Sequence, residues 1–232
     1  MKRLLSLDWD FFPEVTPEAV TGYPGGKELT TEASIAAWQS CYARNSTLAR
    51  IRANCGEMRT LRDVLEGQNR NIPVVAAQSH VGAYGLVLCS LTDGELAEIV
   101  NVDFHHDLVN ENPGLDCGNW IGRLLLSGRT SGQRLTWIHN PLSFPVYGIR
   151  AEAQDEFSAT MQNIDGGTSV RALVGQQFDM IFLARSDAWT PPHLDGEFTG
   201  LVHWMRERFP GMCVYDGVDI PRGDTAMMES CR

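Results

Sequence analysis

Five short apolar runs, rich in β-branched and aromatic residues, constrain the fold of this chain most strongly. Each has the length of a buried strand, and they span residues 3–7, 72–76, 98–102, 134–138 and 178–184. Amphipathic stretches separate most of them, with the clearest helices expected at about residues 31–54, 118–126 and 196–209. Alternating strands and helices favour parallel pairing. The sequence therefore predicts an α/β fold in three layers, with a mainly parallel sheet and helices on both faces.

Nothing in the chain indicates a second domain. The 232 residues contain no internal repeat, low-complexity tract or linker, so one domain is expected over residues 1–232. Thr31 is a plausible cap for the first long helix, and Pro210-Gly211 would stop the last one.

Composition limits the possible partners and compartment. A formal net charge of −10 argues against nucleic acid or an anionic membrane as partner, and it fits a cationic substrate. No apolar run approaches the roughly 20 residues of a membrane span, and Asp8 and Asp10 interrupt the first run too early for a signal peptide. A cytoplasmic protein is expected. The six cysteines form no C-x-x-C pair and are interpreted as free thiols. No sequence pattern indicates an oligomeric state.

Aspartate and histidine residues follow the apolar runs, at the point where each strand should end. They are Asp8 and Asp10 after the first run, His80 after the second, Asp103, His105 and Asp107 after the third, His139 after the fourth and Asp187 after the fifth. The carboxyl ends of parallel strands meet at one edge of a sheet, where such folds bind ligands. The pattern therefore predicts a functional site at this edge.

The spacing within these motifs predicts a metal centre. Alternation along a strand end places Asp8 with Asp10, and Asp103 with His105 and Asp107, on one side of the backbone. Four carboxylates and two imidazoles in one cleft would force some carboxylates to take up protons unless cations neutralise them. Oxygen-rich ligands without a thiolate favour two Mn²⁺ ions, with Fe²⁺, Co²⁺ or Zn²⁺ as alternatives. Taken singly, Asp-x-Asp is also typical of a turn or helix cap, and a lone histidine is typical of a hydrogen-bonded core residue.

These motifs resemble those of the arginase (ureohydrolase) superfamily, whose fold is shared with histone deacetylases. Ser6-Leu7-Asp8-Trp9-Asp10, with Pro13 following, is similar to the family's S-x-D-x-D motif, and residues 103–107 are similar to its D-x-H-x-D motif. His80 corresponds to the separate metal-binding histidine. The resemblance implies that Asp8 and Asp103 bridge two ions, that His80 and Asp107 complete one ion, and that His105 and Asp10 complete the other.

A closer resemblance is to the peptide arginases, which convert arginine to ornithine within ribosomally made precursor peptides. It rests on Asp8-Trp9-Asp10-Phe11-Phe12, on residues 103–108 and on Asn119-Trp120-Ile121. It implies an arginine-containing precursor peptide as the partner. The chain departs from the superfamily in motif order, as if shortened and circularly permuted, and in carrying Ser79 where an aspartate usually precedes the metal-binding histidine. A shorter chain would lack a lid, which favours a bulky peptide substrate.

Three other polar residues, His139, Asp187 and Asn119, each have a functional and a structural interpretation. His139 is the candidate that passes a proton to the leaving amine, or it belongs to a capped turn. Asp187 is the candidate anchor for the guanidinium, or a turn residue. Asn119 is a substrate contact or a helix cap, and His106 should point away from the ligands. The segments near Trp120 and Trp189 are candidate contacts for a peptide.

Three other functions remain possible from the sequence. The protein would be a ureohydrolase that acts on free arginine, agmatine or another guanidino compound, or a metal-dependent deacetylase of the same fold. Deacetylases usually bind a single zinc ion through fewer carboxylates, so the six-ligand set argues against that alternative. A non-catalytic metal-binding protein would not need two ions at an open edge.

Overall fold

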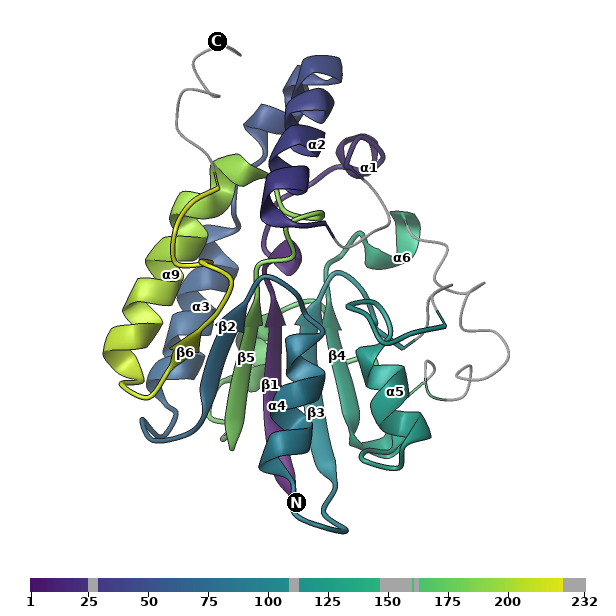
Figure 1. Ribbon diagram of the computed structural model, residues 1–232, viewed down its shortest axis with the longest axis vertical. Helices are drawn as coiled ribbons and strands as arrows, with labels where there is room; N and C mark the ends of the chain where they lie inside the picture. The colour runs from purple at the N-terminus through teal and green to yellow at the C-terminus, as the bar shows by residue number, and fades with distance from the viewer. Residues whose placement is uncertain (25–28, 109–112, 147–159, 161–162, 223–232) are drawn as a thin grey trace.

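A sheet of six parallel strands forms the centre of the protein in this computed structural model (Figure 1). Residues 1–24, 29–108, 113–146, 160 and 163–222 are described. In spatial order the strands are β4 (Leu135–His139), β3 (Ala97–Asp103), β1 (Lys2–Asp8), β5 (Met180–Ala184), β2 (Val74–Ala77) and β6 (Cys213–Val214). Every neighbouring pair is parallel, which confirms the predicted fold class.

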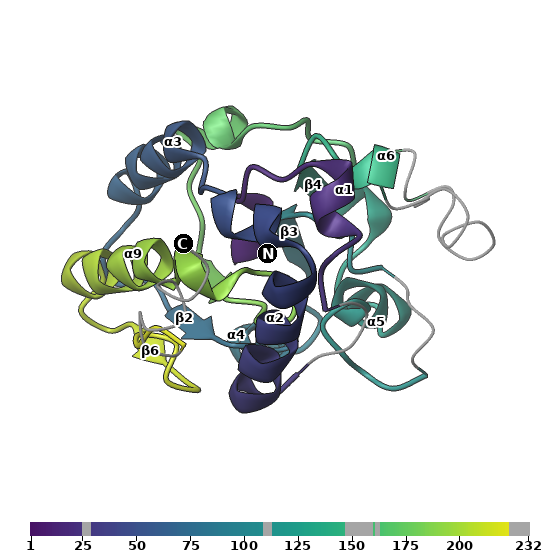
Figure 2. The same cartoon turned by 90° about the horizontal axis from the view of Figure 1, so that it is seen from above.

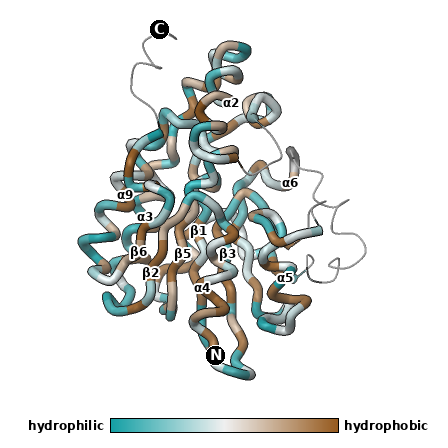
Figure 3. The backbone as a smooth tube through the Cα atoms, viewed as in Figure 1, coloured by the Kyte–Doolittle hydropathy of each residue, from teal (hydrophilic) through white to brown (hydrophobic). Residues whose placement is uncertain are grey.

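Helices cover both faces of the sheet (Figure 2). They are α3 (Cys55–Glu66) and α9 (Asp195–Arg208) on one face, and α4 (Gly82–Ser90) and α5 (Trp120–Leu126) on the other. Alternation along β1 explains the division, because Leu5 and Leu7 join the core beneath α3 and α9, whereas Leu4 joins the core beneath α4 and α5. Hydrophobic segments concentrate in the strands between these layers (Figure 3).

The same alternation directs several polar side chains to the α4 and α5 face. Ser6 and Asp8 have the parity of Leu4 on β1, and Asp103 has the parity of Ile99 on β3. In the sheet register, Asp103 pairs with His139 of β4. The carboxyl ends of β1, β3 and β4 therefore bring these polar residues to one edge of the sheet and one face.

The helix predicted over residues 31–54 is wrong as a single element. The helix α2 (Thr31–Arg44) ends where Asn45 adopts an extended φ of −144°, and a 3-10 helix, η2 (Ser46–Arg50), follows. Asn54 does not end a helix but caps the start of α3, since its Oδ1 accepts from the N–H groups of Gly56 and Glu57 at 3.0 Å each.

The cap predicted for the first long helix is also shifted by one residue. Thr30, rather than Thr31, caps α2, because its hydroxyl oxygen accepts from the N–H of Ala33 at 3.3 Å.

Short helices complete the described chain. They are η1 (Trp9–Phe11), α1 (Pro17–Val20), η3 (Gly132–Arg134), α6 (Ser143–Val146), η4 (Val170–Leu173) and η5 (Pro192–Leu194). Both α1 and α2 lie beyond the carboxyl ends of the strands (Figure 1). Among the helices of the described ranges, none has the length and apolar character needed to cross a membrane.

Candidate metal centre

Aspartate and histidine residues from three strand ends form two overlapping groups. Asp8, His80 and Asp103 form the first group, and Asp10, Asp103 and His105 form the second. Within each group the ligand atoms lie within 4.8 Å of one another. Asp103, the last residue of β3, belongs to both groups. The described residues therefore contain buried Asp and His groups that could hold a metal ion.

His80 lies at the centre of the first group. Its Nδ1 lies 3.1 Å from Oδ2 of Asp8, 3.1 Å from Oδ2 of Asp103 and 3.0 Å from Oδ2 of Asp107. None of these contacts has hydrogen-bond geometry, whereas Nε2 lies 2.6 Å from Oγ of Ser6. If Nε2 donates its proton to Ser6, Nδ1 presents a lone pair to the carboxylates. A spacing of about 3 Å fits adjacent ligand atoms around one divalent cation.

Asp10 and His105 form the more accessible half of the cluster. Nδ1 of His105 lies 2.9 Å from Oδ2 of Asp10 and 3.7 Å from Oδ1 of Asp103. The N–H of Phe104 donates to Oδ1 of Asp10 at 3.1 Å, and the N–H of His105 donates to Oδ1 of Asp103 at 2.7 Å. The loop after β3 thus orients both carboxylates. The side chain of His105 is 23% exposed and that of His80 is 1% exposed, so the His105 half is the part that solvent reaches.

Burial concentrates negative charge in this cluster. Asp8, Asp10, Asp103 and Asp107 are between 0% and 4% exposed. The ion pairs of these four in the described chain are all with histidine. Burial raises the pKa of Asp10 well above its usual value, and repulsion from Asp8 and Asp103 adds to this shift. Burial, with repulsion from Asp103, also raises the pKa of Asp107. A divalent cation would supply the positive charge that keeps these carboxylates ionised.

The pKa values of His80 and His105 are both raised, which favours the protonated imidazole. Burial lowers the pKa of His80, but contacts with Asp103 and Asp107 outweigh it and raise the pKa well above its usual value. Burial also lowers the pKa of His105, but the contact with Asp10 outweighs burial and raises this pKa well above its usual value. Burial raises the pKa of Asp103, but the two histidines reverse this effect and lower it. In the metal-free chain the raised pKa values of His80 and His105 favour their protonated forms, and a metal ion bound to these nitrogens would displace the protons.

Three side chains that the sequence did not indicate as ligand supports fix the carboxylates. Ser186 Oγ donates to Oδ2 of Asp8, Trp120 Nε1 donates to Oδ2 of Asp107 at 2.6 Å, and Asn101 Nδ2 donates to Oδ2 of Asp103 at 3.1 Å. Alternation along β3 could have indicated Asn101, which precedes Asp103 by two residues on the same face. No sequence spacing connects Trp120 or Ser186 with its aspartate, because each comes from another segment of the chain.

A hollow lined by aromatic and apolar side chains opens beside the His105 half. It is lined by Asp10, Val15, Val20, Tyr23, Phe104, His105 and Trp189. The centroids of the Trp189 and His105 rings are 4.6 Å apart. Trp189 also borders a second hollow, which is lined by Leu29, Gln78, Ser79, Cys117, Ser186, Asp187, Ala188 and Trp189. One tryptophan therefore stands between two hollows, and the first of them reaches two candidate metal ligands.

His139 lies next to the cluster in the sheet but faces other partners. It is 6% exposed and ends β4 beside Asp103. Its Nδ1 lies 3.0 Å from the carbonyl oxygen of Asn140, and its Nε2 lies 3.4 Å from Oδ1 of Asp165. The ring packs edge-on against Phe144, with centroids 4.7 Å apart. Its hydrogen bonds and ion pairs in the described part of the chain do not reach the metal-binding side chains.

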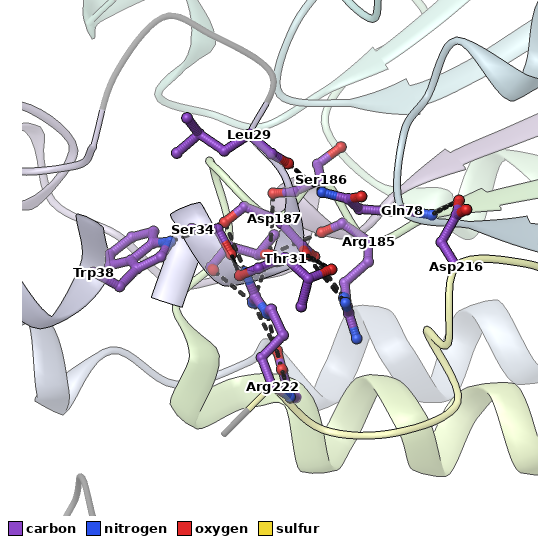
Figure 4. Close-up of polar contacts among 12 residues, drawn as sticks. Leu29, Thr31, Ser34, Trp38, Gln78, Arg185, Ser186, Asp187, Asp216 and Arg222 are labelled. Atoms are coloured by element: carbon purple, nitrogen blue, oxygen red, sulfur yellow. Dashed lines mark hydrogen bonds and ion pairs between the residues drawn. The ribbon is translucent and has the colours of Figure 1, made fainter. Parts of the chain in front are cut away.

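Asp187, the predicted guanidinium anchor, already binds guanidinium groups of the chain itself (Figure 4). Arg185 donates to both of its carboxylate oxygens, from Nε over 2.5 Å and from Nη2 over 3.1 Å. Nη1 of Arg222 lies 3.5 Å from Oδ1, and Thr31 donates its hydroxyl to Oδ2 over 3.1 Å. The side chain of Asp187 is fully buried, and both of its carboxylate oxygens are engaged by groups of the chain itself.

Of the other residues predicted from the sequence to contact a substrate, some are buried in the structure and one borders the two hollows. Trp120 is fully buried, so it supports Asp107 rather than offering a surface to a peptide, whereas Trp189 borders both hollows. Asn119 precedes α5 and fastens the preceding loop, since its Nδ2 donates to the carbonyl of Gly114 at 2.7 Å. His106 accepts from the N–H of Leu108, and burial, with repulsion from His105, lowers its pKa to about 4.

Comparisons of the chain with protein-family models, with curated proteins and with solved structures give no match. The arginase resemblance therefore remains a prediction from the motifs. The metal centre rests on the geometry of the Asp and His side chains.

Proposed function

We propose that the protein is a two-metal hydrolase, preferring Mn²⁺, that converts peptide-bound arginine to ornithine and urea. The observation that carries the proposal is the position of His80 Nδ1, within 3.1 Å of three carboxylates and next to the pair of Asp10 and His105. Adjacent cation positions with oxygen-rich ligands are typical of hydrolases that activate water. The motif resemblance supports arginine in a ribosomally made precursor peptide as the substrate.

The residues of the chain would divide the work of this reaction. When bound, two divalent cations lower the pKa of a water molecule toward neutrality and so provide the nucleophile. The water oxygen bonds to the guanidinium carbon, the bond from this carbon to the side-chain nitrogen breaks, and a proton reaches the leaving amine. Asp10 and His105 line the hollow and would face the substrate. His139, which ends the strand beside Asp103, is the proposed proton donor.

The lining of the two hollows supports a peptidyl arginine. Tyr23, Phe104 and Trp189 give the first hollow aromatic walls, and aromatic rings stack well on a flat guanidinium group. Gln78 and Ser79 give the second hollow polar groups that suit the backbone of a peptide. A peptide would contact the linings of both hollows, whereas a free amino acid would contact only the first. This additional contact area supplies binding energy that positions the guanidinium.

Urea formation by the Mn²⁺-loaded protein tests the proposal. The substrates are arginine-containing peptides, free arginine and agmatine, with an acetyl-lysine peptide to detect deacetylation. We expect urea from the peptides and a mass loss of about 42 Da per converted arginine, as guanidinium hydrolysis requires. A higher kcat/KM for free arginine or agmatine would show an ordinary ureohydrolase, and acetate release without urea would show a deacetylase. Mn²⁺ binding without any turnover would contradict the enzymatic proposal.

A further inference from the structure

Ser186 connects the candidate metal cluster to a buried network of arginines and aspartates. Its hydroxyl donates to Oδ2 of Asp8, the same oxygen that lies 3.1 Å from Nδ1 of His80. Ser186 has a φ of 52°, in the left-handed region that non-glycine residues rarely adopt. Such a conformation persists only where neighbouring contacts enforce it. The orientation of a candidate metal ligand thus depends on what holds Ser186.

The backbone of Ser186 is held on both sides. Its N–H donates to the carbonyl of Gln78 at 2.9 Å, which fastens it to the end of β2. Its carbonyl accepts from the N–H of Trp189 at 2.8 Å and from the N–H of Thr190 at 3.1 Å. The single hydroxyl proton of Thr190 is shared between the carbonyl of Arg185 at 2.8 Å and the carbonyl of Ser186 at 3.1 Å. The Thr190 hydroxyl is therefore part of the structure that enforces the left-handed turn.

Arg222 fastens Thr190 from a distant part of the chain. Its Nη2 donates to the carbonyl of Thr190 at 2.8 Å and to its hydroxyl oxygen at 3.2 Å. Its Nη1 donates to the carbonyl of Asp187 at 2.7 Å. Its backbone N–H, Nε and Nη2 donate to the carboxylate of Asp195 at 2.6, 2.9 and 2.7 Å. The guanidinium is fully buried and joins the loop of Ser186 to the first residue of α9.

We propose that Arg222 is a positioning residue for the metal centre. Through Thr190 it fixes the turn at Ser186, and Ser186 in turn fixes the ligand oxygen of Asp8. A planar guanidinium supplies several donors in a fixed arrangement, so it can hold two carbonyls and a carboxylate at once, which the single ammonium group of lysine cannot do. Replacing a group that holds a ligand from behind typically lowers metal affinity by about 10- to 100-fold. The inference rests on the proposed metal centre, and it assigns Arg222 no contact with the substrate.

Titration with Mn²⁺ alone tests this role in the full chain by isothermal calorimetry. The proteins are the wild type, Arg222→Lys, Ser186→Ala and the double variant. We expect each single variant to lower Mn²⁺ affinity by about 10- to 100-fold. The double variant should bind no more weakly than the weaker single variant, because both changes interrupt one path. Arg206→Lys is the matched control, since Arg206 joins the same C-terminal segment to α9 through Asp219 at 2.8 Å without touching Thr190.

The possible outcomes separate the positioning role from the metal centre itself. If the wild type binds no Mn²⁺, the proposed metal centre is wrong and the role of Arg222 falls with it. If the wild type binds Mn²⁺ and Arg222→Lys lowers only the melting temperature, Arg222 is merely structural. Additive losses in the double variant would show that Arg222 does not act through Ser186. If Arg222→Lys does not fold, Thr190→Ala takes its place, and the same affinity loss and non-additivity with Ser186→Ala are expected.

Discussion

Oδ2 of Asp107 accepts a 2.6 Å hydrogen bond from the indole N–H of Trp120, and the same oxygen lies 3.0 Å from Nδ1 of His80. The backbone of Asp107 is fixed by the same helix, because its carbonyl accepts from the N–H groups of Ile121 and Gly122 at 3.0 and 3.3 Å. Asp107 also has a left-handed φ of 54°. The first turn of α5 therefore sets both the backbone and the side chain of a candidate ligand, which ties the metal centre to the packing of the fold.

The shared position of Asp103 predicts unequal effects of two substitutions. We expect about two Mn²⁺ ions per wild-type chain, as in two-metal hydrolases. Asp103→Ala should abolish binding of both ions, because Asp103 belongs to both groups, whereas Asp10→Ala should spare the ion at His80. Elemental analysis after reconstitution measures the content, with the exposed Asp93→Ala as the control. One zinc ion or none in the wild type would contradict the two-metal proposal.

Replacing His139 tests the proposed proton donor. His139→Ala should lower kcat by roughly 10²–10⁴-fold, the usual contribution of general acid catalysis. Mn²⁺ content should stay at the wild-type value, because among the described residues the imidazole of His139 forms no hydrogen bond or ion pair with the candidate ligands. His203→Ala, which removes an exposed imidazole on α9, is the matched control and should leave kcat unchanged. If the kcat of His139→Ala equals that of the wild type, another group transfers the proton.

Trp189 should matter more for a peptide than for free arginine. Removing its ring in Trp189→Ala takes away a wall of both hollows and the contact with His105. We expect kcat/KM for free arginine to fall by about tenfold, the value of a cation–π contact of moderate strength. The loss for an arginine-containing peptide should be larger, because the peptide also loses its contact at the second hollow. Trp189→Phe keeps an aromatic face and should retain most activity. Steady-state kinetics give kcat/KM of each variant for the peptide and for free arginine. Equal losses for the two substrates would argue against a peptide contact at Trp189.

The raised histidine pKa values predict how the metal-free protein responds to pH. His80 and His105 have a higher pKa in the folded chain than their unfolded value of about 6.5, so the folded state holds more protons above that pH. The free energy of unfolding should therefore fall as the pH rises above about 6.5 and through the raised pKa values of the folded state. His106, with its pKa lowered to about 4, acts in the opposite direction but only below about pH 6.5.

Metal binding should reverse this trend. Because Mn²⁺ displaces the protons of the cluster, its stabilising effect should grow as the pH rises. Thermal melts with a chelator and with excess Mn²⁺, across the same pH range, measure both effects. A melting temperature of the metal-free protein that rises as the pH is raised above about 6.5 would contradict the assigned proton uptake.

The central strands follow from the sequence because their signal is local. Each of the five apolar runs overlaps a strand of the sheet, and the ends at Asp8, Asp103 and His139 lie where the pattern places them. A buried strand needs only a short run of apolar side chains, and parallel pairing brings all the carboxyl ends to one edge. The gathering of the aspartates and histidines could therefore be predicted without knowing the packing.

The helices show where local patterns become ambiguous. The apolar spacing over residues 31–54 fits one long helix, yet Asn45 and Asn54 each cap a new element through their side-chain oxygens. Asparagine competes for backbone N–H groups, and only the packing of the flanking segments decides whether it caps or continues a helix. The two-residue strand β6 is too short to produce a pattern.

Sequence alone determined the strands, their common edge and the residue types that meet there, because these depend on side-chain character and on alternation along each strand. Only the tertiary structure decided which polar group each of them contacts. Ser186 reaches Asp8 across 178 positions of sequence, and Arg222 reaches the loop of Asp187 across 35. Such partners are selected by how distant segments pack, since a hydrogen bond requires its two atoms within about 3 Å and no residue spacing encodes that distance.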